Sequence, residues 1–293
     1  MKEEEIMPEE DLRLTACEME DLDYIEAALT RHSDSFAPPQ EGVQAERLIY
    51  KILAPAGVII AGCVATVDTW GVLAVDTLWV SKRYRRKGLG STLLTQMERL
   101  GREKGCYLSL VGTFDFLSPE FFDKMGYTVF RMEEDYPQGH VAYSLAKRLD
   151  ERVLDKPLPY WIEVGEPEDG EYIEDQLTAY CDSRVECEHG QLPFGSKIAK
   201  EGELIAGYAG GVTQWEGGTL DMLWVAEPYR GQGVGTKLLE MAEVEAQALG
   251  ARLVMISAYD WQVGFFLRRG YVVSGTLEDC PKGHTYYSLT KRL

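Results

Sequence analysis

An internal repeat with an offset of 145 residues constrains the fold more than any other feature. The first copy contains WGVLAVDTLWVSKRYRRKGLGSTLL from Trp70, and the second contains WEGGTLDMLWVAEPYRGQGVGTKLL from Trp215. The offset then falls to 144, where DYPQGH (135–140) matches DCPKGH (279–284). Solenoid repeats recur every ~20–50 residues, so a period this long indicates a duplicated domain. A chain of 293 residues has room for two domains.

The repeat predicts an N-terminal domain over residues 1–150 and a C-terminal domain over residues 160–293. Each copy closes with Lys-Arg-Leu, at 147–149 and at 291–293. We place the boundary in the proline-containing, charged stretch Asp150–Tyr160.

Within each copy, hydrophobic patterning predicts strands on both sides of a central helix. In the first copy we expect strands at 12–17, 47–53, 57–67, 72–80 and 106–113 and a final hairpin over 127–149. We expect helices at Asp21–Arg31, from a glycine turn to about Lys104, and at 118–125. This order favours an α/β layer with a mixed sheet, and the second copy follows the same order.

The acidic charge of the chain limits its partners. The formal net charge is −18, and the division into −8 for residues 1–150 and −10 for 151–293 makes both copies acidic. Nucleic acid and anionic membranes would be repelled, whereas cationic small molecules would be attracted. No apolar run is long enough for a membrane span, and MKEEEIMPEED has no apolar signal core. We therefore expect a soluble, cytoplasmic protein.

The cysteine spacing does not predict a metal-binding site. There is no CxxC pair, and Cys181, Cys187 and His189 lie close together without a recognised zinc spacing. Without a secretory signal, we expect reduced thiols.

A glycine loop follows an apolar strand and precedes a helix in both copies. The loops are RRKGLGS (85–91) and RGQGVGT (230–236). A helix N-terminus offers unpaired N–H groups and partial positive charge, and glycine lets a phosphate approach the backbone. Neither loop matches GxxxxGK[ST] or the dinucleotide GxGxxG pattern. The loops therefore predict binding of another kind of phosphate ester.

The combination of an L-W-V strand, Arg-x-x-Gly-x-Gly and, some 30 residues later, F-F-x-x-x-G-Y resembles the GNAT superfamily of acyl-CoA-dependent N-acetyltransferases. The resemblance covers nearly the whole chain. It implies two tandem α/β (α+β) domains, each a mixed, mostly antiparallel sheet with flanking helices. It also implies acetyl-CoA, or coenzyme A, as cofactor. The thioester would lie at a splay between the L-W-V strand and 106–113, or 252–258 in the second copy.

Carried over by residue, the resemblance implies that loop amides hold the pyrophosphate and that the strand edge pairs with the pantetheine arm. The implied cofactor-binding residues of the first copy are Leu78, Trp79, Val80, Arg85, Arg86, Lys87, Gly88, Leu89, Gly90, Ser91 and Phe122. Those of the second copy are Leu223, Trp224, Val225, Arg230, Gly231, Gln232, Gly233, Val234, Gly235, Thr236 and Phe266.

The sequence differs from the family at the residue that donates a proton to the departing thiolate. The usual residue is a Tyr where this chain has Phe122 and Phe266. Either water or another residue supplies the proton, or one half no longer catalyses. Tyr259 is a candidate substitute acid, with packing as its alternative role.

Four residues are candidate bases for the acceptor amine. Asp76 and Asp221 lie on the L-W-V strands, where we expect Asp76 to share a face with Leu78 and Val80. The alternative role of these carboxylates is structural. His140 and His284 occupy matching P-x-G-H turns, where each is a base or a brace of the turn.

These features predict an N-acetyltransferase that transfers acetyl directly from acetyl-CoA to a primary amine of a small molecule or peptide. We favour the second copy as the catalytic one, because its loop is closer to the family consensus and it contains Tyr259 and Asp221. The alternatives are a non-catalytic acyl-CoA sensor and a specialised tandem transferase of the mycothiol-synthase type. We expect a monomer, because a duplicated chain can bury internally the interface that single domains use to dimerise.

Overall fold

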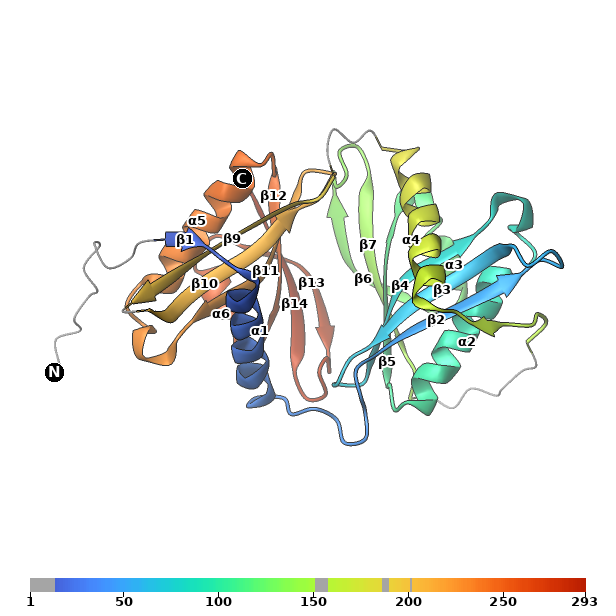
Figure 1. Cartoon of the computed structure of the whole chain (residues 1–293), viewed down its shortest axis with the longest axis horizontal. Coiled ribbons are helices and arrows are strands. Elements are labelled where there is room, and N and C mark those ends of the chain that lie inside the picture. The colour runs from blue at the N-terminus through green and yellow to red at the C-terminus, as the bar shows by residue number, and fades with distance from the viewer. Residues whose placement is uncertain (1–13, 151–157, 186–189, 201) are drawn as a thin grey trace.

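The computed structural model describes residues 14–150, 158–185, 190–200 and 202–293 (Figure 1). The first repeat contains β1 (Leu14–Ala16), α1 (Met19–Asp34), β2 (Glu46–Leu53), β3 (Ile59–Val67), β4 (Val72–Val80), η2 (Lys82–Tyr84), α2 (Leu89–Glu103), β5 (Leu108–Phe114), η3 (Asp115–Leu117), α3 (Glu120–Lys124), β6 (Thr128–Glu134) and β7 (Val141–Arg148). The second repeat contains β8 (Glu163–Val164), α4 (Pro167–Asp182), β9 (Leu192–Lys200), β10 (Glu203–Val212), β11 (Gly217–Val225), η4 (Glu227–Tyr229), α5 (Val234–Ala248), β12 (Leu253–Tyr259), α6 (Val263–Leu267), β13 (Val272–Glu278) and β14 (Thr285–Arg292).

The strands form one continuous sheet in the order β1-β9-β10-β11-β12-β14-β13-β6-β7-β5-β4-β3-β2-β8. In the described ranges, the parallel neighbours are β4 with β5 and β11 with β12, and the other pairs are antiparallel. The two repeats meet where Gly275 of β13 pairs with Arg131 of β6. The expected mixed, mostly antiparallel sheet with flanking helices is confirmed, as is the order of the elements.

The first strand and helix of each repeat pack on the sheet of the other repeat. β1 pairs with β9, and β8 pairs with β2. Figure 1 shows the blue helix α1 against β10 and β11, and the yellow helix α4 across β3 and β4. We call residues 46–150 and 158–185 the first half, and residues 14–35, 190–200 and 202–293 the second half. The predicted ranges 1–150 and 160–293 thus describe the sequence repeat, while the packed halves exchange one strand and one helix.

Matching contacts hold the exchanged helices. Ile173 of α4 is fully buried against Trp79 of β4, and Ile25 of α1 is fully buried against Trp224 of β11. Each helix begins with a capping box that closes on an aspartate, Asp169 or Asp21. Lys51 Nζ lies 2.6 Å from Asp169 Oδ2, and Lys197 forms the corresponding pair with Asp21. Equivalent residues therefore hold α1 and α4 in equivalent positions on the opposite repeats.

Two large cores lie between the sheet and helices α2 and α5. Leu93 and Met97 of α2 are fully buried in the first, and Leu238 of α5 is fully buried in the second. Each half thus has helices on both faces of its part of the sheet. None of the helices within the described ranges combines the length and apolar character needed to cross a membrane.

Candidate functional site

The two glycine loops have the same backbone geometry. Gly88 and Gly233 precede α2 and α5 with φ of 87° and 84°, in the left-handed region that glycine enters at little cost. Arg85 Nε donates to the carbonyl oxygen of Val80 over 2.9 Å, and Arg230 Nε donates to that of Val225 over the same distance. Each arginine therefore ties the loop back to the end of its strand.

Both loops present a run of unpaired backbone amides. Among the residues that the structure describes, the N–H groups of 86–91 and of 231–236 have no intramolecular acceptor. At Gly88 and Gly233, a Cβ would point into nearly open space, with only the ring of Tyr160 within 4 Å of the first. Such a cradle at a helix N-terminus fits a phosphate group, as the sequence predicts.

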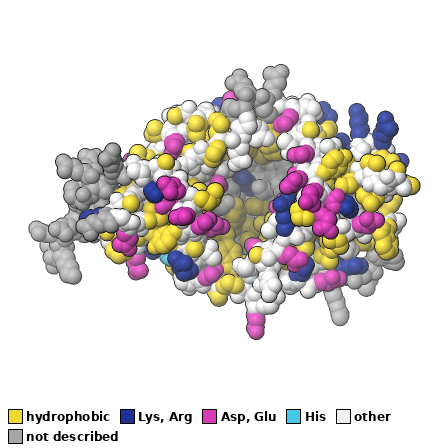
Figure 2. Space-filling model, in the orientation of Figure 1, with side chains coloured by type: hydrophobic (Ala, Val, Ile, Leu, Met, Phe, Trp, Pro, Cys, Tyr) yellow, Lys and Arg dark blue, Asp and Glu magenta, His cyan; other side chains and the backbone are white. Residues whose placement is uncertain are grey.

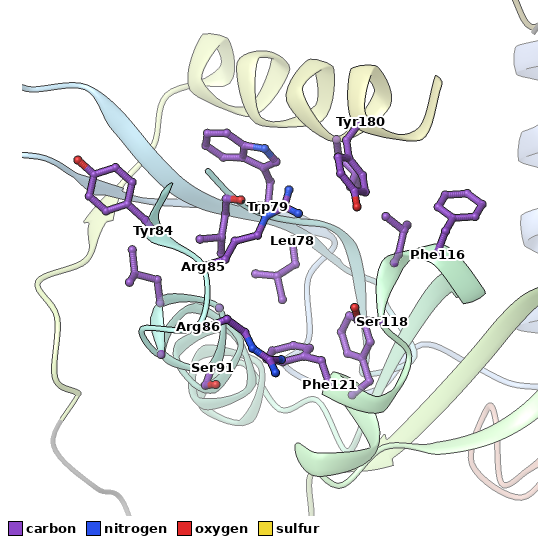
Figure 3. Close-up of a pocket in the computed structure, with 17 residues that line it drawn as sticks. Leu78, Trp79, Tyr84, Arg85, Arg86, Ser91, Phe116, Ser118, Phe121 and Tyr180 are labelled. Atoms are coloured by element: carbon purple, nitrogen blue, oxygen red, sulfur yellow. Dashed lines mark hydrogen bonds between the residues drawn. The ribbon is translucent and has the colours of Figure 1, made fainter. Parts of the chain in front are cut away.

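A cavity of about 410 Å³ lies beside the loop of the first half (Figure 3). It runs from the glycine loop along the end of β4 to η3 and α3, and α4 covers it from the opposite repeat. Its lining residues are Leu78, Trp79, Val80, Tyr84, Arg85, Arg86, Gly88, Leu89, Gly90, Ser91, Phe116, Leu117, Ser118, Phe121, Phe122, Leu177 and Tyr180. All the implied cofactor-binding residues of the first copy line this cavity except Lys87.

The cavity exists because two parallel strands diverge. The ladder between β4 and β5 runs from Val72 to Val75 and stops there, and β11 and β12 likewise pair only from Gly217 to Thr219. Beyond these points each pair leaves space between its strands. The splay expected from the sequence is thus present in both halves.

A bulge interrupts each of these strands at its aspartate. Val64 pairs with Thr77 and Ala65 pairs with Val75, so Asp76 has no partner in the ladder. Asp221 is skipped in the same way between Leu220 and Met222. The sequence reading could not see the extra residue, because every position around it in VLAVDTLWV is compatible with a strand.

The expectation that Asp76 shares a face with Leu78 and Val80 is wrong. Leu78 and Val80 pack with the core under α2, whereas Asp76 accepts a 2.7 Å hydrogen bond from Thr66 on the face of α4. Burial raises the pKa of Asp76, and the Thr66 hydrogen bond opposes this effect. Burial also raises the pKa of Asp221, which lies 3.4 Å from Thr219 Oγ1.

Each histidine turn contains an aspartate–histidine pair. His140 Nδ1 lies 2.9 Å from Asp115 Oδ1, and His284 Nδ1 lies 3.0 Å from Asp260 Oδ2. Both aspartates follow directly after β5 or β12, at the far side of the splay from the L-W-V strand. Sequence reasoning selected the histidines and missed Asp115 and Asp260, although the matching Asp at both positions was a signal for them.

The two pairs differ at the other ring nitrogen. His284 Nε2 lies 3.2 Å from the carbonyl oxygen of Phe36, in the segment after α1. In the described part of the chain, His140 Nε2 has no hydrogen-bond partner, and the ring packs edge-on against Phe116 of the cavity wall at 4.9 Å. Nε2 is therefore open in the pair of His140 and Asp115, whereas in the pair of His284 and Asp260 it contacts the Phe36 carbonyl oxygen.

An aromatic stack fills the equivalent region of the second half. Trp261, which matches Phe116, stacks on Phe36 at 5.1 Å and on Tyr259 at 4.8 Å. Trp70 of the first repeat packs edge-on against Tyr259 at 5.2 Å. Burial raises the pKa of Tyr259, so its phenol is a weaker acid than a free tyrosine.

The family's acid position carries no hydroxyl in either half. Phe122 and Phe266 are buried in the two cores, packed against Tyr127 and Tyr271. The cavity instead receives the hydroxyl of Tyr180 from α4, and Figure 3 shows this hydroxyl directed between Leu78 and Phe116. Sequence reasoning missed Tyr180, because nothing in the sequence indicates that α4 covers the other repeat.

No group of three metal-ligating side chains occurs within the ranges covered by the structure. Cys187 and His189, which the sequence analysis considered with Cys181, lie outside the described residues.

Comparison with known proteins adds the family. The model of the acetyltransferase (GNAT) family matches residues 14–127 and 151–271. The blasticidin-S acetyltransferase of Streptomyces morookaense is 40% identical over 94 residues, which are 32% of this chain and 68% of that protein. An acetyltransferase structure from Bacillus cereus ATCC 14579 is 32% identical and covers 46% of this chain and 95% of its own, with a TM-score of 0.43. Nourseothricin acetyltransferase is 14% identical and covers 47% and 99%, with a TM-score of 0.31. With both repeats matched by its model, the chain belongs to the acetyltransferase (GNAT) family as a tandem of two domains, and it is an acetyltransferase.

Proposed function

We propose that this enzyme transfers the acetyl group of acetyl-CoA to the primary amine of a small cationic molecule, and that the first half is the working site. The observation that carries the proposal is the cavity beside the first glycine loop. It joins a run of unpaired amides to the splayed end of β4.

The residues of the first half fit coenzyme A. The unpaired amides of 86–91 suit its pyrophosphate, and the free edge at Leu78–Val80 suits the amides of its pantetheine arm. When bound, acetyl-CoA would supply an activated acyl group. The protein then has to position an amine, take a proton from it and polarise the reacting carbonyl.

His140 is the proposed base. Its Nδ1 faces the Asp115 carboxylate, and a ring that donates Nδ1–H there carries the lone pair of its neutral form on Nε2. His284 has acceptors at both nitrogens, the Asp260 carboxylate and the Phe36 carbonyl. Neither ring nitrogen of His284 is therefore open to an acceptor amine. This difference favours the first half, although the loop sequence alone favours the second.

A cationic acceptor is supported by charge and by the relatives. Figure 2 shows a hollow between the two halves with acidic side chains on both sides of it, on a chain of net charge −18. Such a surface attracts a protonated amine at long range. The blasticidin-S acetyltransferase that the chain resembles is named for a small-molecule acceptor.

The test is thiol release from acetyl-CoA over a panel of amines that includes blasticidin S, a polyamine, an aminoglycoside and a basic peptide. It compares the wild type with Gly88→Glu and Gly233→Glu, which place an anion in one loop each. We expect turnover by the wild type, none by Gly88→Glu and nearly full turnover by Gly233→Glu.

Gly57→Glu is the matched control. Gly57 also has a positive φ, of 77°, and a Cβ there meets nothing within 4 Å, so the variant carries the same backbone strain and charge away from the loop. Turnover lost in Gly233→Glu but kept in Gly88→Glu would assign the second half instead. Coenzyme A binding without turnover on any amine would leave a sensor rather than an enzyme acting on these acceptors.

A further inference from the structure

We propose that Tyr180, carried into the first-half cavity by the exchanged helix α4, donates the proton that the departing coenzyme A thiolate needs. The inference rests on the proposed function and deepens it. Amide formation breaks the bond between sulfur and the acyl carbon, and the sulfur leaves as an anion unless a nearby group protonates it. Phe122 has no proton to give, so this role requires another residue of the cavity.

The position of Tyr180 suits this role. It lines the cavity together with Leu78 and Phe116, which lie on the two sides of the splay. Figure 3 shows its hydroxyl directed into the space between them. The other hydroxyl groups of the lining belong to Tyr84, Ser91 and Ser118. Of these, Tyr84 ends η2 and Ser91 lies in the first turn of α2, so both border the glycine loop at the phosphate end of the cavity.

The hydrogen bonds of Tyr180 leave its own proton available. Arg184 Nη2 lies 2.8 Å from the hydroxyl oxygen, and a guanidinium can only donate, so the oxygen is the acceptor. Within the described residues, no acceptor takes the hydroxyl proton of Tyr180. The O–H bond is therefore free to point toward a bound sulfur.

Two guanidinium groups favour loss of that proton. Arg184 donates to the oxygen, and the guanidinium carbon of Arg85 lies 4.7 Å from the centre of the ring. Burial alone would raise the pKa of Tyr180, but the Arg184 hydrogen bond and the nearby Arg85 guanidinium outweigh it and leave the pKa lowered. Within the ranges that the structure describes, the charged groups that act on the phenol are these two arginines, one just after α4 and one from the loop.

The proton balance closes without a further reactant. The acceptor nitrogen loses its protons to His140 and water as the amide forms, and Tyr180 gives one proton to sulfur as the carbon–sulfur bond breaks. The phenolate, held by the two guanidinium groups, regains a proton from water. The net products are the amide, the free thiol and one proton released to solvent.

The experiment measures kcat, the Kd for coenzyme A and the dependence of kcat on pH for the wild type, Tyr180→Phe and Arg184→Gln. We expect Tyr180→Phe to lower kcat by roughly 100-fold or more, as for loss of a general acid, with coenzyme A affinity within threefold of wild type. The fall of kcat at alkaline pH in the wild type should be absent in this variant. In Arg184→Gln that fall should shift to higher pH.

Tyr172→Phe is the matched control, because Tyr172 lies on the same helix but packs on Trp79 at 6.0 Å, away from the cavity. It should keep kcat within twofold, and equal thermal stability of the two variants shows that both fold. A kcat of Tyr180→Phe within threefold of wild type, or an unchanged alkaline fall, overturns the role of Tyr180 alone. A wild type without turnover on any amine overturns the proposed function and this role with it.

Discussion

His284 Nε2 lies 3.2 Å from the carbonyl oxygen of Phe36, whereas its counterpart His140 keeps that nitrogen free of any partner among the described residues. The two turns are otherwise built alike, from P-x-G-H and an aspartate at the end of the neighbouring strand. A single contact from the segment after α1 thus engages in one turn the ring nitrogen that is open in the other.

The first prediction compares the two histidines. His140→Gln should lower kcat by about 100-fold or more, because loss of a positioned base costs roughly 10²–10⁴ in rate. His284→Gln should leave kcat within about threefold, because both nitrogens of that ring are engaged by Asp260 and by the Phe36 carbonyl. Steady-state thiol release with the best amine of the panel measures both. Equal losses in the two variants would show that both halves catalyse or that the turns act only through stability.

The second prediction concerns Tyr259, which the sequence analysis considered as an acid. Its hydroxyl makes no hydrogen bond within the described chain, and its ring packs between Trp261 and Trp70. Tyr259→Phe should therefore leave kcat unchanged and alter stability by no more than about 0.5 kcal/mol. Tyr259→Ala serves as the contrasting variant, since it removes the packed ring and should destabilise by about 3–5 kcal/mol. A large loss of kcat in the Phe variant would restore Tyr259 as an acid.

Local sequence patterns predicted the helices and strands well, but they could not predict on which half of the sheet the first strand and helix of each repeat would pack. The strands and helices follow from apolar periodicity and from the glycine turns, and their order in the structure is as expected. The exchange of α1 and α4 leaves no such signal, because the two repeats have similar sequences along the strands that these helices cover. Trp79 and Trp224 occupy matching positions, and each receives one isoleucine of an exchanged helix, Ile173 or Ile25.

The backbone features of the site could be predicted from the sequence. The residues that reach the site because the two halves exchange a helix could not. The loops at Gly88 and Gly233 could be read from spacing alone, since the turn needs glycine. A strand with strictly alternating side chains cannot put Leu73 and Leu78 on the same face, yet both pack in one core. The bulge at Asp76 makes this possible, and the sequence pattern did not predict it. Tyr180 could not be placed, because its partner residues lie in the other repeat.

The third prediction tests the exchange in solution. Ile173→Ala should destabilise the chain by about 2–5 kcal/mol, because the side chain is fully buried between α4 and the first-half strands. Thr178→Ala on the exposed side of the same helix should stay within about 0.5 kcal/mol of wild type. Urea unfolding at equilibrium measures both. Ile173→Ala should also change the tryptophan fluorescence, and this change should be absent in a Trp79→Phe background. If α4 instead packed on its own repeat, the change would come from Trp224 and would persist in Trp79→Phe.

The last prediction concerns the dependence of stability on pH at the ion pair between Asp169 and Lys51. The hydrogen bond from Lys51 lowers the pKa of Asp169 below its ordinary value of 3.8, helped by the backbone N–H of Glu166. A carboxyl group with a lowered folded-state pKa stabilises the fold fully above its unfolded pKa, and this contribution is lost as the pH falls through the folded pKa. Asp169→Asn should therefore be less stable than wild type by about 1–3 kcal/mol at pH 7.

The gap between Asp169→Asn and wild type should close as the pH drops below 3.8 toward the lowered folded-state pKa, where the wild-type carboxyl also becomes protonated. The measurement is urea unfolding at a series of pH values, with Asp175→Asn on the exposed face of α4 as control. Because Asp21 and Lys197 form the equivalent pair at α1, Asp21→Asn should show the same profile. A gap that persists unchanged at pH 2 would assign the loss to the capping box rather than to the charge that ties the exchanged helix to the opposite sheet.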